Sequence, residues 1–152
     1  PKSFEDIAAE LSEPEIPTEK QTENRFGAYE CEYSVFKRLF WLERRAVARS
    51  GETVYLCLLS IEWPDGRKMK ADVLGRAAER MKMVIQGSLR ASDIFSRYSV
   101  CQYVVLIPAA TYENCEAVME RITRAFNKGY VRKDVAAVSR ITAVFPADRE
   151  CF

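Results

Sequence analysis

Residues 90–108 read Arg90-Ala-Ser-Asp93-Ile-Phe-Ser-Arg-Tyr98-Ser-Val-Cys-Gln-Tyr103-Val-Val-Leu-Ile-Pro108. They hold two runs of strand-forming residues, 93–98 and 101–107, joined by a very short connection. Strands this close in sequence pair as a β-hairpin. Pro108 ends the second strand, because proline has no backbone N–H for the ladder. The stretch therefore predicts a hairpin in the middle of the fold.

Helical and strand patterns alternate on both sides of this hairpin. Apolar residues recur at helical spacing over 32–49, 70–89 and 112–126, whereas 53–61 and 135–144 are rich in strand formers. The predicted order is helix, strand, helix, hairpin, helix, strand. This order indicates an α+β or α/β fold, in which a central mixed sheet containing the hairpin is flanked by helices.

Residues 1–28 differ in character from the rest. Ser3 can cap a short helix that runs through Leu11, and the polar, proline-punctuated segment after it is typical of a linker. We therefore expect an N-terminal helix and linker over 1–28 and one domain over 29–152. Because the chain starts at Pro1 without a leader, we also expect it to be a piece of a longer protein.

Composition excludes several classes of function. The chain has 152 residues, 23 Lys and Arg against 22 Asp and Glu, and no histidine. A net charge of +1 gives no field to attract nucleic acid, and no apolar run is long enough for a membrane span. The absence of histidine removes Ser-His and Cys-His nucleophile pairs. The five scattered cysteines form no C-x-x-C pair, so we expect buried thiols in a reducing cytosol and neither a metal site nor a cofactor.

The hairpin stretch resembles the core of the GGDEF family, the diguanylate cyclases. Arg90 and Asp93 stand at the spacing of the family's R-x-x-D, Arg97 and Tyr98 match its usual Arg-Tyr, and Leu58–Glu62 takes the place of its L-L-D-I-D. The resemblance covers about residues 32–144. It implies the GGDEF-like, nucleotide cyclase-like fold.

The residues that would carry cyclase chemistry depart from the family pattern. The family's first metal-binding aspartate falls at Ser60, which leaves Glu62 of the acidic pair. The glycine-rich signature is replaced by Ser99, Val100, Cys101, Gln102 and Tyr103. Cys101 and Gln102 offer no anionic oxygen for Mg²⁺, and Val100 is stiff and bulky where glycine lets the backbone approach phosphate. The segment 63–70 is also too short for the family's guanine-recognition loop. We therefore expect no enzymatic activity.

The R-x-x-D pair has two interpretations. In many family members it forms the inhibitory site for cyclic di-GMP, which implies that Arg90 and Asp93 bind this ligand. Alternatively, Asp93 caps the turn into the hairpin, and Arg90 is a solvated cation at a helix end.

Another motif lies in the helix predicted over 32–49. Arg44, Arg45 and Arg49 form a basic strip there, which we interpret as a solvated helix face because Glu43 and Glu52 lie close. We interpret the aromatic residues of the same helix, Phe40 and Trp41, as packing in the core or in a dimer interface.

Three phrases, at 29–37, 42–51 and 96–103, are similar to one branch of degenerate GGDEF domains. These are the C-terminal domains of bacterial transcriptional regulators that carry a bacterial transcriptional activator domain. The resemblance implies a cytoplasmic, non-catalytic signalling module. Its partners would be the upstream DNA-binding and activator domains and a second copy in a homodimer, with no direct nucleic acid or membrane contact by this fragment. The competing hypothesis is a receptor for cyclic di-GMP or GTP.

Overall fold

The computed structural model describes residues 3–12, 27–130 and 132–146. Its helices and strands, in chain order, are α1 Phe4–Ser12, β1 Tyr29–Glu30, α2 Tyr33–Ser50, β2 Val54–Glu62, α3 Ala71–Ser88, β3 Ile94–Ser99, β4 Gln102–Pro108, α4 Tyr112–Gly129 and β5 Ala136–Ala143. The predicted alternation and the central hairpin, β3–β4, are confirmed. None of the described helices has both the length and the apolar character to span a bilayer.

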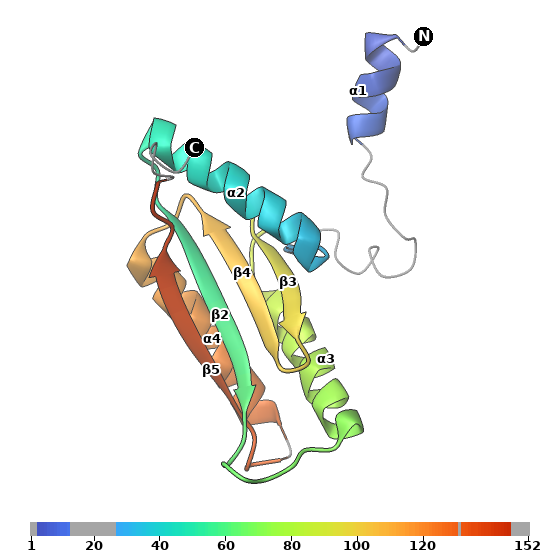
Figure 1. The fold of residues 1–152 in the computed structure, drawn as a ribbon, viewed down its shortest axis with the longest axis vertical. Helices are drawn as coiled ribbons and strands as arrows, with labels where there is room; N and C mark the ends of the chain where they lie inside the picture. The colour runs from blue at the N-terminus through green and yellow to red at the C-terminus, as the bar shows by residue number, and fades with distance from the viewer. Residues whose placement is uncertain (1–2, 13–26, 131, 147–152) are drawn as a thin grey trace.

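The five strands form one mixed sheet in the order β1-β3-β4-β2-β5. Only the β1–β3 pair is parallel, and the other three pairs are antiparallel. Helices α3 and α4 cover one face of the sheet, and α2 lies across part of the other face (Figure 1). The expected fold class, a mixed sheet flanked by helices, is therefore confirmed.

Alternation along the strands divides the core between the two faces. Cys57, Leu59 and Ile61 of β2 point toward α3 and α4 and are almost completely buried. Val54 points toward α2, where it joins a smaller apolar cluster with Phe36 and Val47. The larger cluster therefore lies between the sheet and the α3–α4 layer, which anchors the central strand along most of its length.

The cysteines behave as predicted for small apolar residues. Cys31, Cys57 and Cys115 are buried free thiols and Cys101 is half-buried, whereas Cys151 lies outside the described residues. Burial, reinforced by Cys115, raises the pKa of Cys57 to about 12. Burial and the Glu30 carboxylate raise the pKa of Cys31 to about 11. Neither thiol is therefore a thiolate at neutral pH.

Two details of the fold differ from the sequence-based expectation. The two-residue strand β1 was not predicted, because a run this short carries no alternation pattern. Helix α4 continues to Gly129 instead of ending at Phe126. The guanidinium of Arg80 on α3 donates to the carbonyls of Ala125 and Phe126, which satisfies the end of α4 from outside. It also occupies the space that a Cβ at Gly129 would fill, so glycine fits this last turn.

Candidate functional site

The end of β2 and the tip of the β3–β4 hairpin lie side by side in the sheet. Ser60 of β2 is opposite Gln102 of β4 in the antiparallel register, and the N–H of Ile61 donates to the carbonyl of Cys101 at 2.8 Å. Ser60 and Glu62 are two residues apart on one strand, so their side chains project from the same face of the sheet. This pairing brings the end of β2, with Ser60 and Glu62, next to the hairpin residues 99–103.

Neutral polar side chains at this point form a hydrogen-bonded network. The Oγ of Ser99 donates to the Oε1 of Gln102 at 3.1 Å, and the Nε2 of Gln102 donates to the Oγ of Ser60 at 3.3 Å. The backbone N–H of Cys101 donates to the Oγ of Ser99. The side chains of Ser60, Ser99 and Gln102 thus hydrogen-bond to one another and link β2 to the neighbouring hairpin.

This donor set does not fit Mg²⁺. The ion takes hard oxygen ligands, with one or two carboxylates as its usual protein anchors, whereas the network offers two hydroxyls, an amide and a nearby thiol. In the described part of the chain, no group of three or more Asp, Glu, Cys or His side chains is arranged to hold a metal ion. No catalytic step through a metal follows from these residues.

The turn of the hairpin is held by an arginine whose role the sequence did not reveal. The Nε of Arg97 donates to the carbonyl of Ser99 at 3.1 Å, and its Nη2 donates to the carbonyl of Val100 at 3.0 Å. A register irregularity between Arg97 and Ser99 lets the side chain bend back over its own turn. Both carbonyls thereby have a cationic partner, and the backbone at Val100 is fixed without glycine.

The last of the five residues 99–103, Tyr103, belongs to the core. Its ring is 2% exposed and its hydroxyl donates to the carbonyl of Ala78 on α3 at 3.1 Å. Burial raises the pKa of Tyr103 to about 12. The side chain therefore points to the face opposite the network of Ser60 and Gln102 and fastens the hairpin to α3.

Arg90 and Asp93 lie at the other end of the hairpin. Their separation from the tip is the length of β3, a six-residue strand, or about 20 Å. The carboxylate of Asp93, 3% exposed, accepts from the backbone N–H of Arg90 at 2.8 Å and from the Nη2 of Arg90 at 3.3 Å. The same Nη2 donates to the carbonyl of Pro108. The structure thus pairs the two predicted residues with each other and keeps them apart from Ser99–Tyr103.

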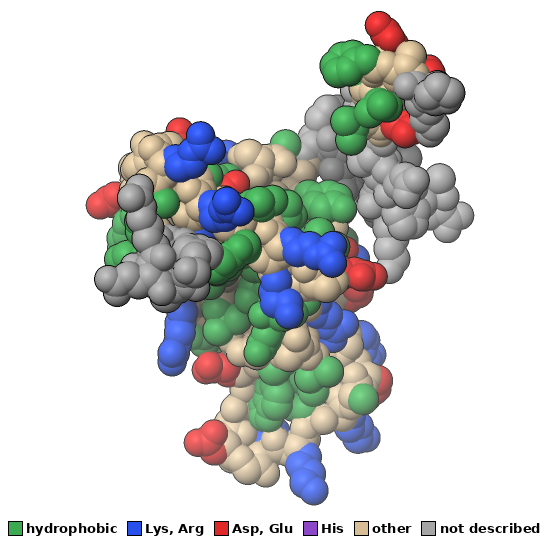
Figure 2. All heavy atoms as spheres, turned by 45° about the horizontal axis from the view of Figure 1, so that its top comes forward, with side chains coloured by type: hydrophobic (Ala, Val, Ile, Leu, Met, Phe, Trp, Pro, Cys, Tyr) green, Lys and Arg blue, Asp and Glu red, His purple; other side chains and the backbone are tan. Residues whose placement is uncertain are grey.

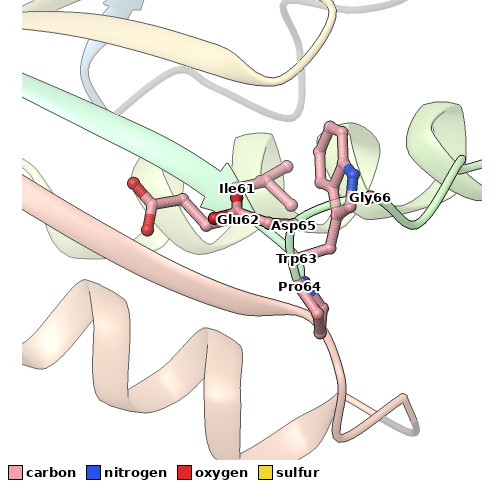
Figure 3. Close-up of a pocket in the computed structure, with 6 residues that line it drawn as sticks. All are labelled: Ile61, Glu62, Trp63, Pro64, Asp65 and Gly66. Atoms are coloured by element: carbon pink, nitrogen blue, oxygen red, sulfur yellow. The ribbon is translucent and has the colours of Figure 1, made fainter.

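An open pocket of about 440 Å³ follows β2 directly. It is lined by Ile61–Gly66, and the turn at Pro64–Gly66 is closed by the N–H of Arg67, which donates to the carbonyl of Pro64. Figure 3 shows the Glu62 carboxylate pointing away from the Trp63 indole. The pocket is therefore lined by an indole and a carboxylate that point in different directions.

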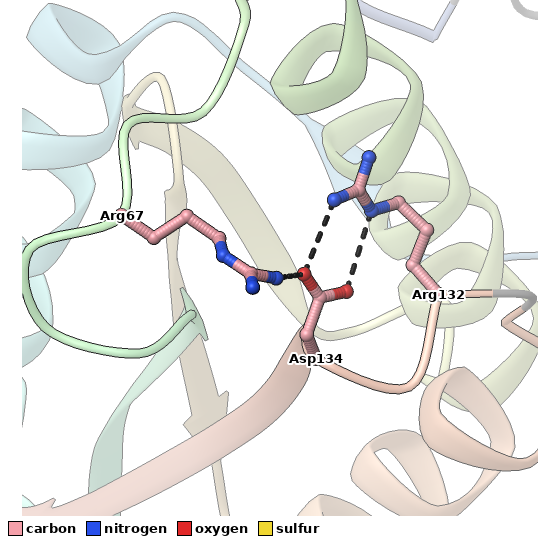
Figure 4. A network of polar contacts seen from close by, with 3 residues as sticks. All are labelled: Arg67, Arg132 and Asp134. Carbon is pink, nitrogen blue, oxygen red and sulfur yellow. Dashed lines mark hydrogen bonds and ion pairs between the residues drawn. The ribbon is translucent and has the colours of Figure 1, made fainter.

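Two arginines share one carboxylate beside this turn (Figure 4). Asp134, just before β5, accepts two hydrogen bonds from Arg132, at 3.3 and 3.1 Å, and is also ion-paired with Arg67. Arg132 and then Arg67 lower the pKa of Asp134 to about 2. The pairing ties the loop after β2 to the start of β5.

Asp134→Asn is expected to reduce the acid sensitivity of the fold. The folded-state pKa of about 2 lies below the ordinary value of 3.8, so the carboxylate stabilises the fold above about pH 4 and loses this contribution as the pH falls toward 2. The measurement is urea unfolding of both proteins between about pH 6 and pH 2. The stability difference should narrow steadily with acid, and a constant difference would contradict the assignment.

The chain matches no protein-family model and no curated protein sequence. Among solved structures, it is similar to a diguanylate cyclase protein from Thermotoga maritima, with a TM-score of 0.60 and 13% identity over 76% of this chain and 81% of that one. The GGDEF domain of DgcB from Caulobacter crescentus, solved with c-di-GMP, gives 0.63 and 10% over 76% and 74%.

Diguanylate cyclase SiaD from Pseudomonas aeruginosa, solved with its activator SiaC, gives a TM-score of 0.66 and 18% identity. The match covers 97% of this chain and 56% of SiaD. Together these structures define the class of fold: the nucleotide cyclase-like α+β fold. Within that class the fold is the GGDEF-like fold of diguanylate cyclases, as the hairpin stretch predicted.

Proposed function

We propose that this chain is a non-catalytic signalling domain of a bacterial transcriptional regulator, acting through dimerisation or contact with a protein partner. The observation that carries the proposal is the neutral network of Ser60, Ser99 and Gln102 at the position that the family uses for metal and phosphate. Its atoms hydrogen-bond to one another and supply no carboxylate to balance a magnesium triphosphate.

Contact with a protein partner is supported by the surface of α2 and by a structural neighbour. Trp41 and Leu42, neighbours in sequence on α2, are 41% and 58% exposed, and adjoining exposed apolar side chains are a feature of interaction surfaces. SiaD, which shares the fold, is solved in complex with its activator SiaC. The sequence resemblance supports the proposal that the domain is part of a transcriptional regulator. Sequencing the gene tests it, because a DNA-binding region is expected to be encoded upstream.

A receptor for cyclic di-GMP or GTP is the second candidate, and one observation favours it. The side chain of Arg90 is 57% exposed, and its Nε and Nη1 make no hydrogen bond to the described residues. Asp93 weighs against it, because both of its carboxylate oxygens are already taken by Arg90 and the side chain is buried. A nucleotide that used Asp93 would first have to break these contacts.

Incubation with GTP and Mg²⁺, followed by chromatography, is expected to give no cyclic product. Titration calorimetry with cyclic di-GMP and with GTP should show no binding tighter than about 1 mM. Any cyclic di-GMP formed would refute the non-catalytic assignment. Binding that is abolished by Arg90→Ala, but unchanged by Arg76→Ala at another exposed arginine, would establish the receptor instead.

A further inference from the structure

The outer face of α2 is both basic and apolar. Arg38, Arg45 and Arg49, at spacings of seven and four residues, lie on one side of the helix and are exposed. Beside this row lie Val35 and Leu42, which are 37% and 58% exposed. Figure 2 shows Lys and Arg side chains over α2 with hydrophobic side chains between them. We call these five residues the outer face of α2.

Helix α1 has the complementary character. Its three large apolar residues, Phe4, Ile7 and Leu11, form a single stripe and are 80%, 44% and 81% exposed. The helix contains no basic residue, and Glu5 and Glu10 fall on opposite flanks of the stripe. The acidic residues beside its stripe are opposite in charge to the arginine row of α2, and the stripe is apolar like Val35 and Leu42.

A helix as short as α1 needs a partner surface. Isolated helices below about 12–15 residues are marginal in water, and α1 has nine residues. Its start is well capped, because the Oγ of Ser3 accepts from the N–H of Asp6 and the N–H of Ser3 donates back to the Asp6 carboxylate. Such a cap adds only about 1 kcal/mol, so burial of the apolar stripe has to supply the rest.

The same chain can deliver α1 to this face. Fourteen residues, 13–26, separate α1 from the described body, and a chain of that length can reach across as much as about 50 Å. Helix α2, with 18 residues, is about 27 Å long. A tethered helix acts at an effective concentration on the order of millimolar, so even a weak contact is populated within one chain.

We propose that the outer face of α2 is a docking site for an acidic amphipathic helix, and that its occupant is α1 of the same chain. Nucleic acid is a poorer occupant, because Val35 and Leu42 lie beside the arginines and a phosphate backbone offers them no apolar surface. The inference rests on the proposed function, which uses the exposed surface of α2 around Leu42 for contact, and it names α1 as the segment that covers the outer face of α2. The assay with GTP and Mg²⁺ tests the non-catalytic function, whereas hydrogen exchange tests the docking of α1. Either proposal can therefore fail while the other holds.

Hydrogen exchange of the chain of 152 residues measures the docking directly. The amides of residues 7–12 are expected to be protected in the unaltered protein, and Leu42→Asp or Arg45→Glu should lower their protection about tenfold. Arg76→Glu is the matched control, since it makes the same charge change at an exposed position on α3, on the other side of the sheet. Equal protection in all four proteins would overturn the proposal.

A charge exchange separates docking from any intrinsic effect on α1. Glu5→Arg with Glu10→Arg should remove the protection of α1, and adding Arg38→Glu with Arg45→Glu should restore it. Docking within one chain predicts that the protection of α1 does not change with protein concentration, whatever mass light scattering gives. Protection that rises with concentration together with a dimer mass would assign the face to a second copy. Binding of a double-stranded DNA oligonucleotide that is lost in Arg45→Glu would assign it to nucleic acid, and either result would refute the same-chain occupant.

Discussion

Replacing Asp93 by alanine is expected to lower the free energy of unfolding by about 2–4 kcal/mol, even with no nucleotide present. The carboxylate is 3% exposed and accepts two hydrogen bonds from Arg90, one from the backbone N–H and one from the guanidinium. Alanine removes both acceptors and leaves a partly buried N–H without its partner. Because this turn leads directly into β3, the loss also loosens the start of the hairpin.

Two further variants separate the parts played by the two residues. Asp93→Asn keeps an oxygen that can accept the N–H of Arg90 and should cost about 1 kcal/mol, since only the charge is lost. Arg90→Ala should cost about 1 kcal/mol or less, because its guanidinium is 57% exposed and its ion pair is screened by water. Urea unfolding with unchanged m-values is the measurement. If Asp93→Ala is as stable as the unaltered protein, the turn-capping interpretation is wrong.

The hairpin could be predicted from sequence because its information is local. Two strand-forming runs, a very short connection and Pro108 are all visible within the span 90–108, and they are enough to predict that β3 and β4 pair. Apolar periodicity likewise placed α2, α3 and α4 within a few residues of their observed bounds. The residues 99–103 could be singled out as a candidate site for the same reason.

The contacts that shape the candidate site were not visible in the sequence, because they join distant segments. The Ser60–Gln102 hydrogen bond spans 42 positions, and the Arg67–Asp134 pair spans 67. Arg97 was matched only as part of an Arg-Tyr pair, and its hold on the turn carbonyls depends on an irregularity in the ladder. The sequence contains no pattern that predicts this register irregularity. The chemistry of the site was therefore predictable by residue type, whereas its geometry was not.

Glu30→Ala is expected to destabilise the fold by about 2–4 kcal/mol through the lysine it leaves behind. The Nζ of Lys82 on α3 lies 2.9 Å from the Oε1 of Glu30 on β1, and their side chains are only 13% and 30% exposed. Removing the carboxylate leaves the largely buried ammonium of Lys82 without its counter-ion. The loss in free energy of unfolding is therefore larger than the net stabilisation by the ion pair itself. The two-residue strand β1 should fray first, because it is held by one neighbouring strand and this ion pair.

The double variant tests that explanation against simple loss of a contact. Lys82→Met in the Glu30→Ala background should recover most of the lost stability, because a thioether of similar length needs no counter-ion. Lys82→Met alone should cost less than Glu30→Ala, since Glu30 keeps more access to water. The exposed Asp72–Arg76 pair of α3 is the control, and Asp72→Ala there should change stability by less than about 0.5 kcal/mol. If Lys82→Met gives no recovery in the double variant, the stranded charge is not what destabilises Glu30→Ala.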